Sequence, residues 1–304
     1  METMNRELED PKLQLPQHIR KSNSLIQASY RLSVIEQRII LACIAQLPAM
    51  KEITDEVMYS VRAQDISEMS ESRSKNEYKA LKDAALRLKR REVWISTKPN
   101  STEKHKKTIV TGWVQTIQYV EDEGSVELRF SKDILPYISQ ISSNYTPYEL
   151  RDVVKLTNSY SIRLYEMLIQ WRSKGYRELS VDELRDYLRL ENKYESIKDL
   201  KKYVIDPSIK QINEHTPINV EWNQRKTGRR VSHILFFFTE KQQPEPEQQP
   251  EKEPEKPIEA ESEVTKVEPK EKPKKAQRPS GMTEKQANRK AISEHVMDIE
   301  DTNW

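Results

Sequence analysis

Basic side chains gather around one predicted turn late in the sequence: Arg225, Lys226, Arg229 and Arg230. Thr227-Gly228 predicts a tight turn, and residues 218–222 and 231–238 have the composition and alternation of paired strands. The side chains expected to point inward from the first strand are Ile218, Val220 and Trp222. Packing does not explain four cations on one turn, whereas contact with nucleic-acid phosphates does.

A helix with lysines on one side is predicted just before this hairpin. Its apolar positions follow helical spacing and should face a core: Ile197, Leu200 and Val204. The outward residues proposed to contact DNA are Ser196, Lys198, Lys201 and Lys202. Pro207 should end or kink this helix, because proline lacks the amide donor and clashes with the preceding turn.

The first half of the chain has a similar pattern. A helix ending near Leu88 is predicted, with Tyr78, Leu81 and Ala85 on its apolar face. Its polar side supplies further candidates for DNA contact: Arg73, Ser74, Lys75, Lys79 and Lys82. Strand-forming segments at 93–96 and 108–120 flank a stretch with four lysines, which predicts a second basic hairpin.

Any exposed helix carries lysines, so one such helix alone is weak evidence for DNA binding. The same order of helix and basic hairpin in both halves makes DNA binding the favoured interpretation. We therefore expect an α+β fold with two tandem winged-helix domains. The predicted divisions are a flexible arm at 1–18, domain 1 at 19–143, domain 2 at 144–240 and a tail at 241–304.

Two capping boxes are predicted to start the helices that position these surfaces. Ser33 with Glu36 should begin a helix that runs to about Leu47, and Ser180 with Glu183 should begin another that runs to about Leu190. A stripe on the first helix recurs every four residues, at Ile35, Ile39, Cys43 and Leu47. This stripe should be buried in the core or against another subunit. A strongly amphipathic helix is expected at 158–171.

The tail has a composition that opposes folding. Eight of the 16 prolines fall in 241–304, among many Glu, Lys and Gln residues. We expect a disordered spacer at 241–280 and a marginal helix at 282–299. The formal charge of the whole chain is only +2, so the placement of the cations matters more than their sum.

Catalytic, cofactor and metal sites are not expected. Cys43 is the only cysteine, which excludes a disulfide framework and a cysteine zinc site and suggests a reducing cytoplasm. No window is apolar enough to span a membrane, and no Gly-rich phosphate loop occurs among the five glycines. The five histidines are scattered, without the pair that a DNA-nicking metal site needs: His18, His105, His215, His233 and His295.

Several segments, taken in order and spacing, resemble the iteron-binding plasmid replication initiators of the RepE and RepA type. The segments that carry the resemblance are 21–26 (KSNSLI), 30–38 (YRLSVIEQR), 134–137 (ILPY), 158–166 (NSYSIRLYE) and 226–229 (KTGR). The resemblance spans about Ile19 to Phe238 and leaves the tail out.

The resemblance implies a protein that, as a monomer, binds repeated origin sites (iterons) through two winged-helix domains and helps to open the duplex. It also implies a dimer, joined through the first domain, that binds an inverted repeat and represses its own promoter. The implied partners are host DnaA, the replicative helicase and chaperones that separate dimers. Such a protein acts in plasmid copy control.

Carried over to this sequence, the resemblance implies that the base-reading helix of domain 2 contacts DNA through Ser196, Lys198, Lys201 and Lys202. It places the wing at Arg225, Lys226, Arg229 and Arg230. In the family this helix often bears arginines that grip guanine with two hydrogen bonds. Lysines at 201 and 202 make less directional contacts, so base specificity at those positions is an open question.

Two other functions remain open at this stage. A winged-helix transcriptional repressor without an initiation role would use the same surfaces, and a lone inverted repeat as target would favour it over repeated sites. An adaptor whose winged helices contact protein is the third possibility. Binding that weakens steeply with salt would argue against the adaptor, because such a dependence reports neutralised phosphates.

Overall fold

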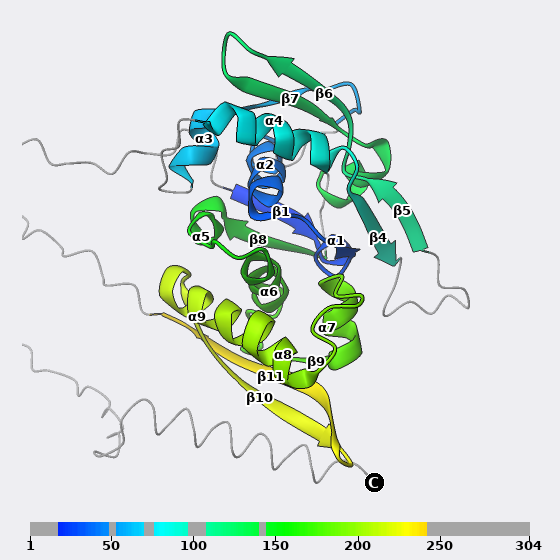
Figure 1. The fold of residues 1–304 in the computed structure, drawn as a ribbon, viewed down its shortest axis with the longest axis vertical. Coiled ribbons are helices and arrows are strands. Elements are labelled where there is room, and N and C mark those ends of the chain that lie inside the picture. Colours follow the sequence, from blue (N-terminus) through cyan, green and yellow to red (C-terminus); the bar gives the residue numbers. More distant parts are fainter. Residues whose placement is uncertain (1–17, 49–52, 70–75, 97–107, 140–143, 242–304) are drawn as a thin grey trace, which may run out of the picture. The chain divides into compact units, whose positions relative to one another are not determined.

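The computed structural model describes residues 18–48, 53–69, 76–96, 108–139 and 144–241. These residues belong to one unit of helices and short antiparallel sheets (Figure 1). Some predictions lie outside the described residues: the arm up to residue 17, the lysine-rich stretch before residue 108, and the tail from residue 242.

The first half alternates short strands with helices. Its elements are β1 (His18–Ser22), α1 (Asn23–Ile26), β2 (Ser29–Tyr30), α2 (Val34–Ala45), β3 (Tyr59–Arg62), α3 (Ala63–Glu68), α4 (Glu77–Leu88), β4 (Glu92–Ser96), β5 (Thr108–Gly112), β6 (Val114–Val120), β7 (Ser125–Phe130) and the 3-10 helix η1 (Lys132–Tyr137). The predicted capping box begins α2: the Ser33 hydroxyl accepts from the Glu36 amide, and the Glu36 carboxylate accepts from the Ser33 amide. The sheet order β3-β7-β6 places three antiparallel strands beside α2, α3 and α4.

The second half repeats this plan. Its elements are β8 (Tyr145–Glu149), α5 (Leu150–Val154), α6 (Ser159–Ile169), β9 (Tyr176–Ser180), α7 (Val181–Tyr187), α8 (Ile197–Leu200), the π-helical turn η2 (Lys201–Ile205), α9 (Asp206–His215), β10 (Ile218–Thr227) and β11 (Arg230–Glu240). Ser180 and Glu183 form the second predicted capping box. The sheet order β10-β11-β9 corresponds to the order β6-β7-β3 of the first half. In both, a late hairpin pairs with an earlier strand that leads into a helix: β3 leads into α3, and β9 leads into α7.

The predicted hairpin of the first half is present as β4 paired with β5, but the extent of its second strand needs correction. Residues 108–120 are not one strand: the chain bends at Trp113, so that β5 pairs with β4 and β6 pairs with β7. Trp113 is fully buried and packs edge-to-face on Tyr30 with 4.9 Å between ring centroids, which explains the bend. The hairpin in the position of the wing is therefore β6–β7. Its turn is acidic, with Glu121, Asp122 and Glu123.

Proline chemistry predicted that Pro207 would end or kink the helix. The helical run does not end there but continues through α9 to His215. The turn before the proline widens instead: the Asp206 amide donates to the Lys201 carbonyl, five residues back. A π turn gives the proline ring room and needs no amide donor at that position. The lysines at 201 and 202 thus lie on a widened turn.

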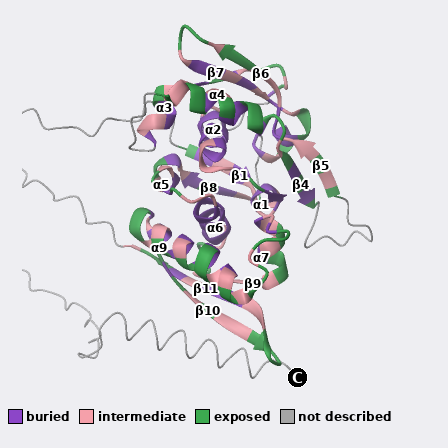
Figure 2. Cartoon of the chain, in the orientation of Figure 1, coloured by how far each residue is buried: buried purple, intermediate pink, exposed green. Residues whose placement is uncertain are grey.

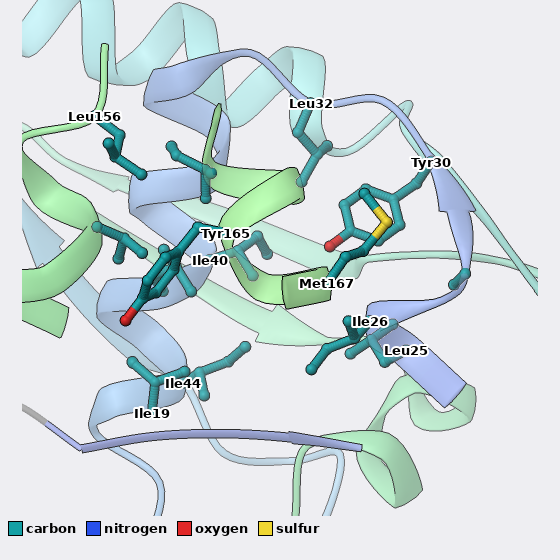
Figure 3. Packing of buried hydrophobic residues seen from close by; sticks show 14 of the residues in the cluster. Ile19, Leu25, Ile26, Tyr30, Leu32, Ile40, Ile44, Leu156, Tyr165 and Met167 are labelled. Atoms are coloured by element: carbon teal, nitrogen blue, oxygen red, sulfur yellow. The ribbon is translucent and has the colours of Figure 1, made fainter. Parts of the chain in front are cut away.

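Two helices are buried on all sides and form the centre of the core. In α2 every residue from Glu36 to Ala45 is buried, and in α6 every residue from Tyr160 to Ile169 (Figure 2). The sequence predicted one buried stripe on α2 and one apolar face on α6, whereas the buried surface extends around both helices. Around α2 and α6 pack apolar side chains from distant segments, including Ile19, Leu25 and Leu156 (Figure 3).

The two halves share strand pairing as well as a core. β8 pairs antiparallel with β1, so Ile19 lies opposite Tyr148. Asn144 takes a left-handed φ of 54°, and its carbonyl accepts from the Asn23 amide. The domain boundary expected near residue 143 stays a prediction.

Candidate nucleic-acid interface

The helix predicted to read bases lies against the basic hairpin. Lys201 Nζ donates to Gln224 Oε1 on β10 and sits 5.5 Å from the centroid of the Trp222 ring. Gln224 adjoins Arg225, where the hairpin nears its turn. α8 with η2, here called the reading helix, and the β10–β11 hairpin therefore present one continuous surface.

Two lysines of the reading helix are exposed. Lys198 and Lys202 both face solvent, and Lys202 Nζ lies 4.9 Å from the centroid of the Tyr203 ring. Tyr203 is 46% exposed and stacks on Tyr194 with 5.7 Å between ring centroids. The sequence analysis missed Tyr203, although an aromatic residue directly after Lys202 on a polar helix face is a signal that could have found it.

Ser196 has a local structural role. Its hydroxyl accepts from the Asp199 amide at 3.0 Å and donates to the Asp199 carboxylate at 2.8 Å, which caps the start of α8. Capping contacts of this kind stabilise helix ends by about 1 kcal/mol. The proposed DNA contact of Ser196 stays a prediction.

The tip of the hairpin carries three uncompensated cations. Gly228, with φ of 61°, begins the two-residue turn that it forms with Arg229, because Thr227 pairs with Arg230. The exposed residues Lys226, Arg229 and Arg230 have no carboxylate partner among the described residues. Nothing in the described part of the chain therefore competes with phosphate for these three side chains.

Arg225 differs from its neighbours on the hairpin. Its guanidinium forms an ion pair of 2.6 Å with Glu178 on β9. Glu178 also accepts from the Tyr176 hydroxyl at 2.9 Å. Burial, the hydrogen bond to Glu178 and its negative charge raise the pKa of Tyr176. Arg225 is thus fixed in place at the base of the tip.

The candidates in the first half fall into three groups. Arg73, Ser74 and Lys75 lie outside the described residues. Lys79 is exposed on α4. Lys82 forms an ion pair of 2.8 Å with Glu121 of the acidic turn and lies 4.9 Å from the Tyr119 ring centroid.

The hydrogen bond from Lys82 to Glu121 raises the pKa of Lys82. Among the described residues, the first half thus offers a weaker cationic surface than the second. The strands of its predicted basic hairpin do pair, as β4 with β5, while the lysine-rich connection between them lies outside the described residues.

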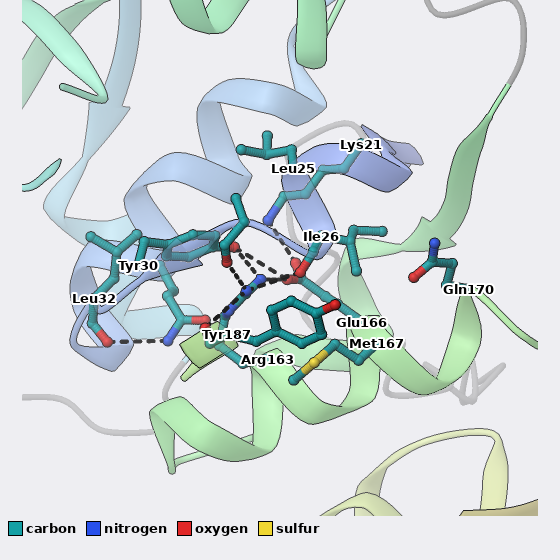
Figure 4. Close-up of polar contacts among 12 residues, drawn as sticks. Lys21, Leu25, Ile26, Tyr30, Leu32, Arg163, Glu166, Met167, Gln170 and Tyr187 are labelled. Carbon is teal, nitrogen blue, oxygen red and sulfur yellow. Dashed lines mark hydrogen bonds and ion pairs between the residues drawn. The ribbon is translucent and has the colours of Figure 1, made fainter. Parts of the chain in front are cut away.

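A buried polar cluster holds the scaffold beneath these surfaces (Figure 4). Glu166 on α6 accepts from Lys21 Nζ at 2.6 Å, from the Tyr148 hydroxyl at 2.5 Å and from Arg163 at 3.2 Å. Arg163 also donates to the carbonyls of Ile26 and Ala28 at 2.9 and 2.8 Å. The cluster joins β1, the segment after α1, β8 and α6.

The cluster is buried, and its charges depend on one another. Burial alone would raise the pKa of Glu166, but Lys21, Arg163 and the hydroxyl of Tyr148 outweigh it, so the pKa lies below its usual value of 4.5. Burial lowers the pKa of Lys21, although Glu166 opposes this effect. Sequence reasoning missed this cluster, because its members come together only in the folded chain.

Within the described residues, no group of three or more histidine, cysteine, aspartate or glutamate side chains is arranged to hold a metal ion. No helix in the same ranges has the length and apolar character needed to cross a bilayer.

The repeated unit of packed helices, three antiparallel strands and a late hairpin defines a tandem winged-helix protein. Among the described residues, its strongest cationic surface lies in the second unit. The chain belongs to the initiator replication protein family. The first winged-helix domain of that family (WH1) matches residues 18–169, and the second (WH2) matches residues 180–238. The fold class and the family resemblance predicted from the sequence are thereby confirmed.

Individual relatives agree with this assignment. A replication initiation protein of Escherichia coli is 30% identical over 232 residues, which cover 71% of this chain and 67% of the relative. The PI protein of Escherichia coli is 24% identical over 253 residues, covering 72% and 82%. The crystal structure of the Pi initiator protein in complex with iteron DNA has a TM-score of 0.63 at 23% identity, and it covers 75% of this chain and 99% of that one. This last likeness shows the fold.

Proposed function

We propose that the protein initiates plasmid replication by binding repeated origin sites as a monomer and opening the adjacent duplex. The observation that carries the proposal is the continuous surface of the reading helix and the hairpin, joined through Lys201 and Gln224. Membership of the initiator family favours initiation over simple repression. Binding should be tested on duplexes with direct repeats and with scrambled repeats over a range of salt concentrations.

The geometry suggests a division of labour between the two parts of this surface. A helix of this size fits the major groove, where base edges carry a distinct pattern of donors and acceptors. The hairpin tip, with Lys226, Arg229 and Arg230, would hold the flanking phosphates and fix the register. The first domain would contribute Lys79, and Lys82 once it leaves Glu121, together with Arg73, Ser74 and Lys75.

Base discrimination should depend on the reading helix. Replacing Lys201 and Lys202 by alanine is expected to reduce the preference for the repeat over a scrambled duplex by about 1–3 kcal/mol per lost base contact. Affinity for the scrambled duplex should fall much less. Competition binding with both duplexes measures the ratio.

Replacing Lys210 by alanine serves as the control for the reading helix, because Lys210 lies on α9 and pairs with Glu214. An unchanged preference in the Lys201 and Lys202 variant would mean that another surface reads the bases.

A dimer through the first domain would account for repression of the protein's own promoter. β5 is an outer strand of the sheet β2-β4-β5, and Val110 on it lies opposite Trp94. The two side chains are 47% and 38% exposed. An apolar pair at an open strand edge invites pairing with a second copy.

Replacing Val110 by glutamate is therefore expected to weaken dimerisation at least tenfold, or about 1.4 kcal/mol, because a charge would be buried in the paired edge. Analytical ultracentrifugation over a concentration series measures the dissociation constant. Val57→Glu is a matched control, since Val57 is 42% exposed but lies outside any strand, between a turn and β3. Equal dissociation constants for the two variants would place the interface elsewhere.

The remaining parts of the proposal concern partners and chemistry. We expect the protein to act in the bacterial cytoplasm without catalysing a reaction itself. Host DnaA, the replicative helicase and the chaperones that separate dimers would supply the steps after origin binding. The tail, outside the described residues, is proposed to contact a host replication protein.

A further inference from the structure

A basic pocket of about 230 Å³ lies between residues of the two family domains. Its lining residues are Arg31, Arg90, Arg91, Glu92, Arg189 and Glu191. Arg31 follows β2, Arg90 and Arg91 lie between α4 and β4, and Glu92 begins β4. Arg189 and Glu191 lie between α7 and α8. Four arginines face two glutamates, so the lining carries excess positive charge.

Contacts between the two domains build this pocket. Pairing of β2 with β4 places Ser29 opposite Trp94 and so brings the following Arg31 towards Glu92. The Ser29 hydroxyl donates to the Asp186 carbonyl of α7 at 2.6 Å. The Arg189 guanidinium lies 5.0 Å from the Trp94 ring centroid. The end of α7 is therefore fastened to the first domain at the wall of the pocket.

The loop that carries Arg189 has an uncommon backbone. Arg189, Asn192 and Tyr194 all take left-handed conformations, with φ of 49°, 57° and 50°. Residues with a side chain adopt this region infrequently, and strained positions of this kind concentrate at binding sites. Arg189 is also held by Glu191 at 3.2 Å. Its guanidinium is thus positioned before any ligand arrives.

The arginines of the pocket differ in how far their charge is compensated. Arg91 shares the buried Glu36 with Arg87, with contacts of 3.1 Å each. The exposed Arg31 and Arg90 form no ion pair with any carboxylate in the described ranges. Two uncompensated guanidinium groups beside one pocket repel each other, and a bound anion would relieve that repulsion. Guanidinium forks match the oxygens of phosphate in geometry.

We propose that this arginine pocket binds a phosphate group. The phosphate could belong to the DNA backbone between the two domains, in which case the inference rests on the proposed function, or it could be a free phosphate. Arg90 lies just after α4, and Glu191 lies in the loop that leads to α8, so the pocket is lined by segments that adjoin the helix proposed to face DNA in each domain. That position favours the backbone as the source.

The test compares two double variants of the full chain. Arg31→Ala with Arg90→Ala removes the uncompensated pocket charges, and Arg151→Ala with Arg172→Ala removes two arginines elsewhere. Each is titrated with inorganic phosphate by calorimetry without DNA, and with a direct-repeat duplex over a salt series. Melting temperatures check that both variants fold. Arg31→Lys with Arg90→Lys keeps the charges but removes the planar guanidinium groups, which can donate two hydrogen bonds to one phosphate.

For a backbone phosphate, the pocket variant should lose about tenfold in duplex affinity, and the salt slope should fall by up to about 1.8. The lysine variant should recover the slope but only part of the affinity. For a free phosphate, calorimetric binding should vanish in the pocket variant while duplex affinity stays unchanged. A pocket variant equal to the control in both titrations would overturn the proposal. Failure of the wild type to prefer the repeat would reject the proposed function, and the phosphate titration would still decide the pocket.

Discussion

Replacing Glu166 by alanine is expected to lower the free energy of unfolding by about 3–5 kcal/mol, because it leaves two buried cations without a carboxylate. Lys21 and Arg163 are both almost fully buried and both contact Glu166. Urea denaturation followed by circular dichroism measures the loss. DNA binding should disappear at temperatures where the variant unfolds, although Glu166 touches no proposed DNA contact.

An exposed ion pair provides the matched control. Glu240 pairs with Arg172 on the surface, and Glu240→Ala should cost only a small fraction of the loss seen for Glu166. A loss for Glu166→Ala no larger than that of the control would show that the cluster does not hold the scaffold.

The Glu166 effect should also depend on pH. Because the folded protein lowers the pKa of Glu166 below 4.5, its stabilising contribution is complete above pH 4.5 and is lost as the pH falls through the lowered value. The advantage of the wild type over Glu166→Gln should therefore shrink in acid. A constant advantage down to low pH would contradict a charged Glu166.

The second large effect is expected at the hairpin tip. Replacing Arg229 and Arg230 by alanine should weaken binding to every duplex sequence by roughly 150-fold or more, since each of the two lost charge-assisted contacts costs about 1.5 kcal/mol or more. The slope of log affinity against log salt should fall by about 1.8 if each arginine contacts one phosphate. Fluorescence anisotropy with repeat and scrambled duplexes over a salt series gives both values.

The Arg151→Ala and Arg172→Ala pair again serves as the control, because it removes the same charge away from the hairpin. If it weakens binding as much as the tip variant does, the effect is one of net charge and the tip does not grip phosphates. A loss confined to the repeat duplex would instead assign the arginines to base reading.

Local signals in the sequence predicted local structure well. Ser33 and Glu36 predicted the start of α2, because caps depend on residues close together in the chain. The turn predicted at Thr227-Gly228 lies one residue later, at Gly228-Arg229, because Thr227 still pairs with Arg230. The bend at Trp113 was not predicted, because it depends on packing against Tyr30. The π turn before Pro207 likewise relieves a clash in a way that composition does not reveal.

The segments that carried the family resemblance are mainly those that build the scaffold. Lys21, Tyr30, Arg163 and Glu166 all lie in the quoted segments, and all belong to the buried cluster. Of the proposed DNA contacts, only Lys226 and Arg229 lie in a quoted segment. This explains why the resemblance fixed the fold and family, while the residues of the candidate interface stay predictions.

The central claim is that both winged-helix domains bind the same DNA repeat. Its most direct test is a footprint of the full chain on a duplex that carries direct repeats. Protection of guanine N7 reports the major groove, and hydroxyl-radical cleavage reports the backbone. The proposed function predicts two protected major grooves per repeat, on one face and about one helical turn apart. Protection of a single groove, or the same pattern on a scrambled duplex, would contradict it.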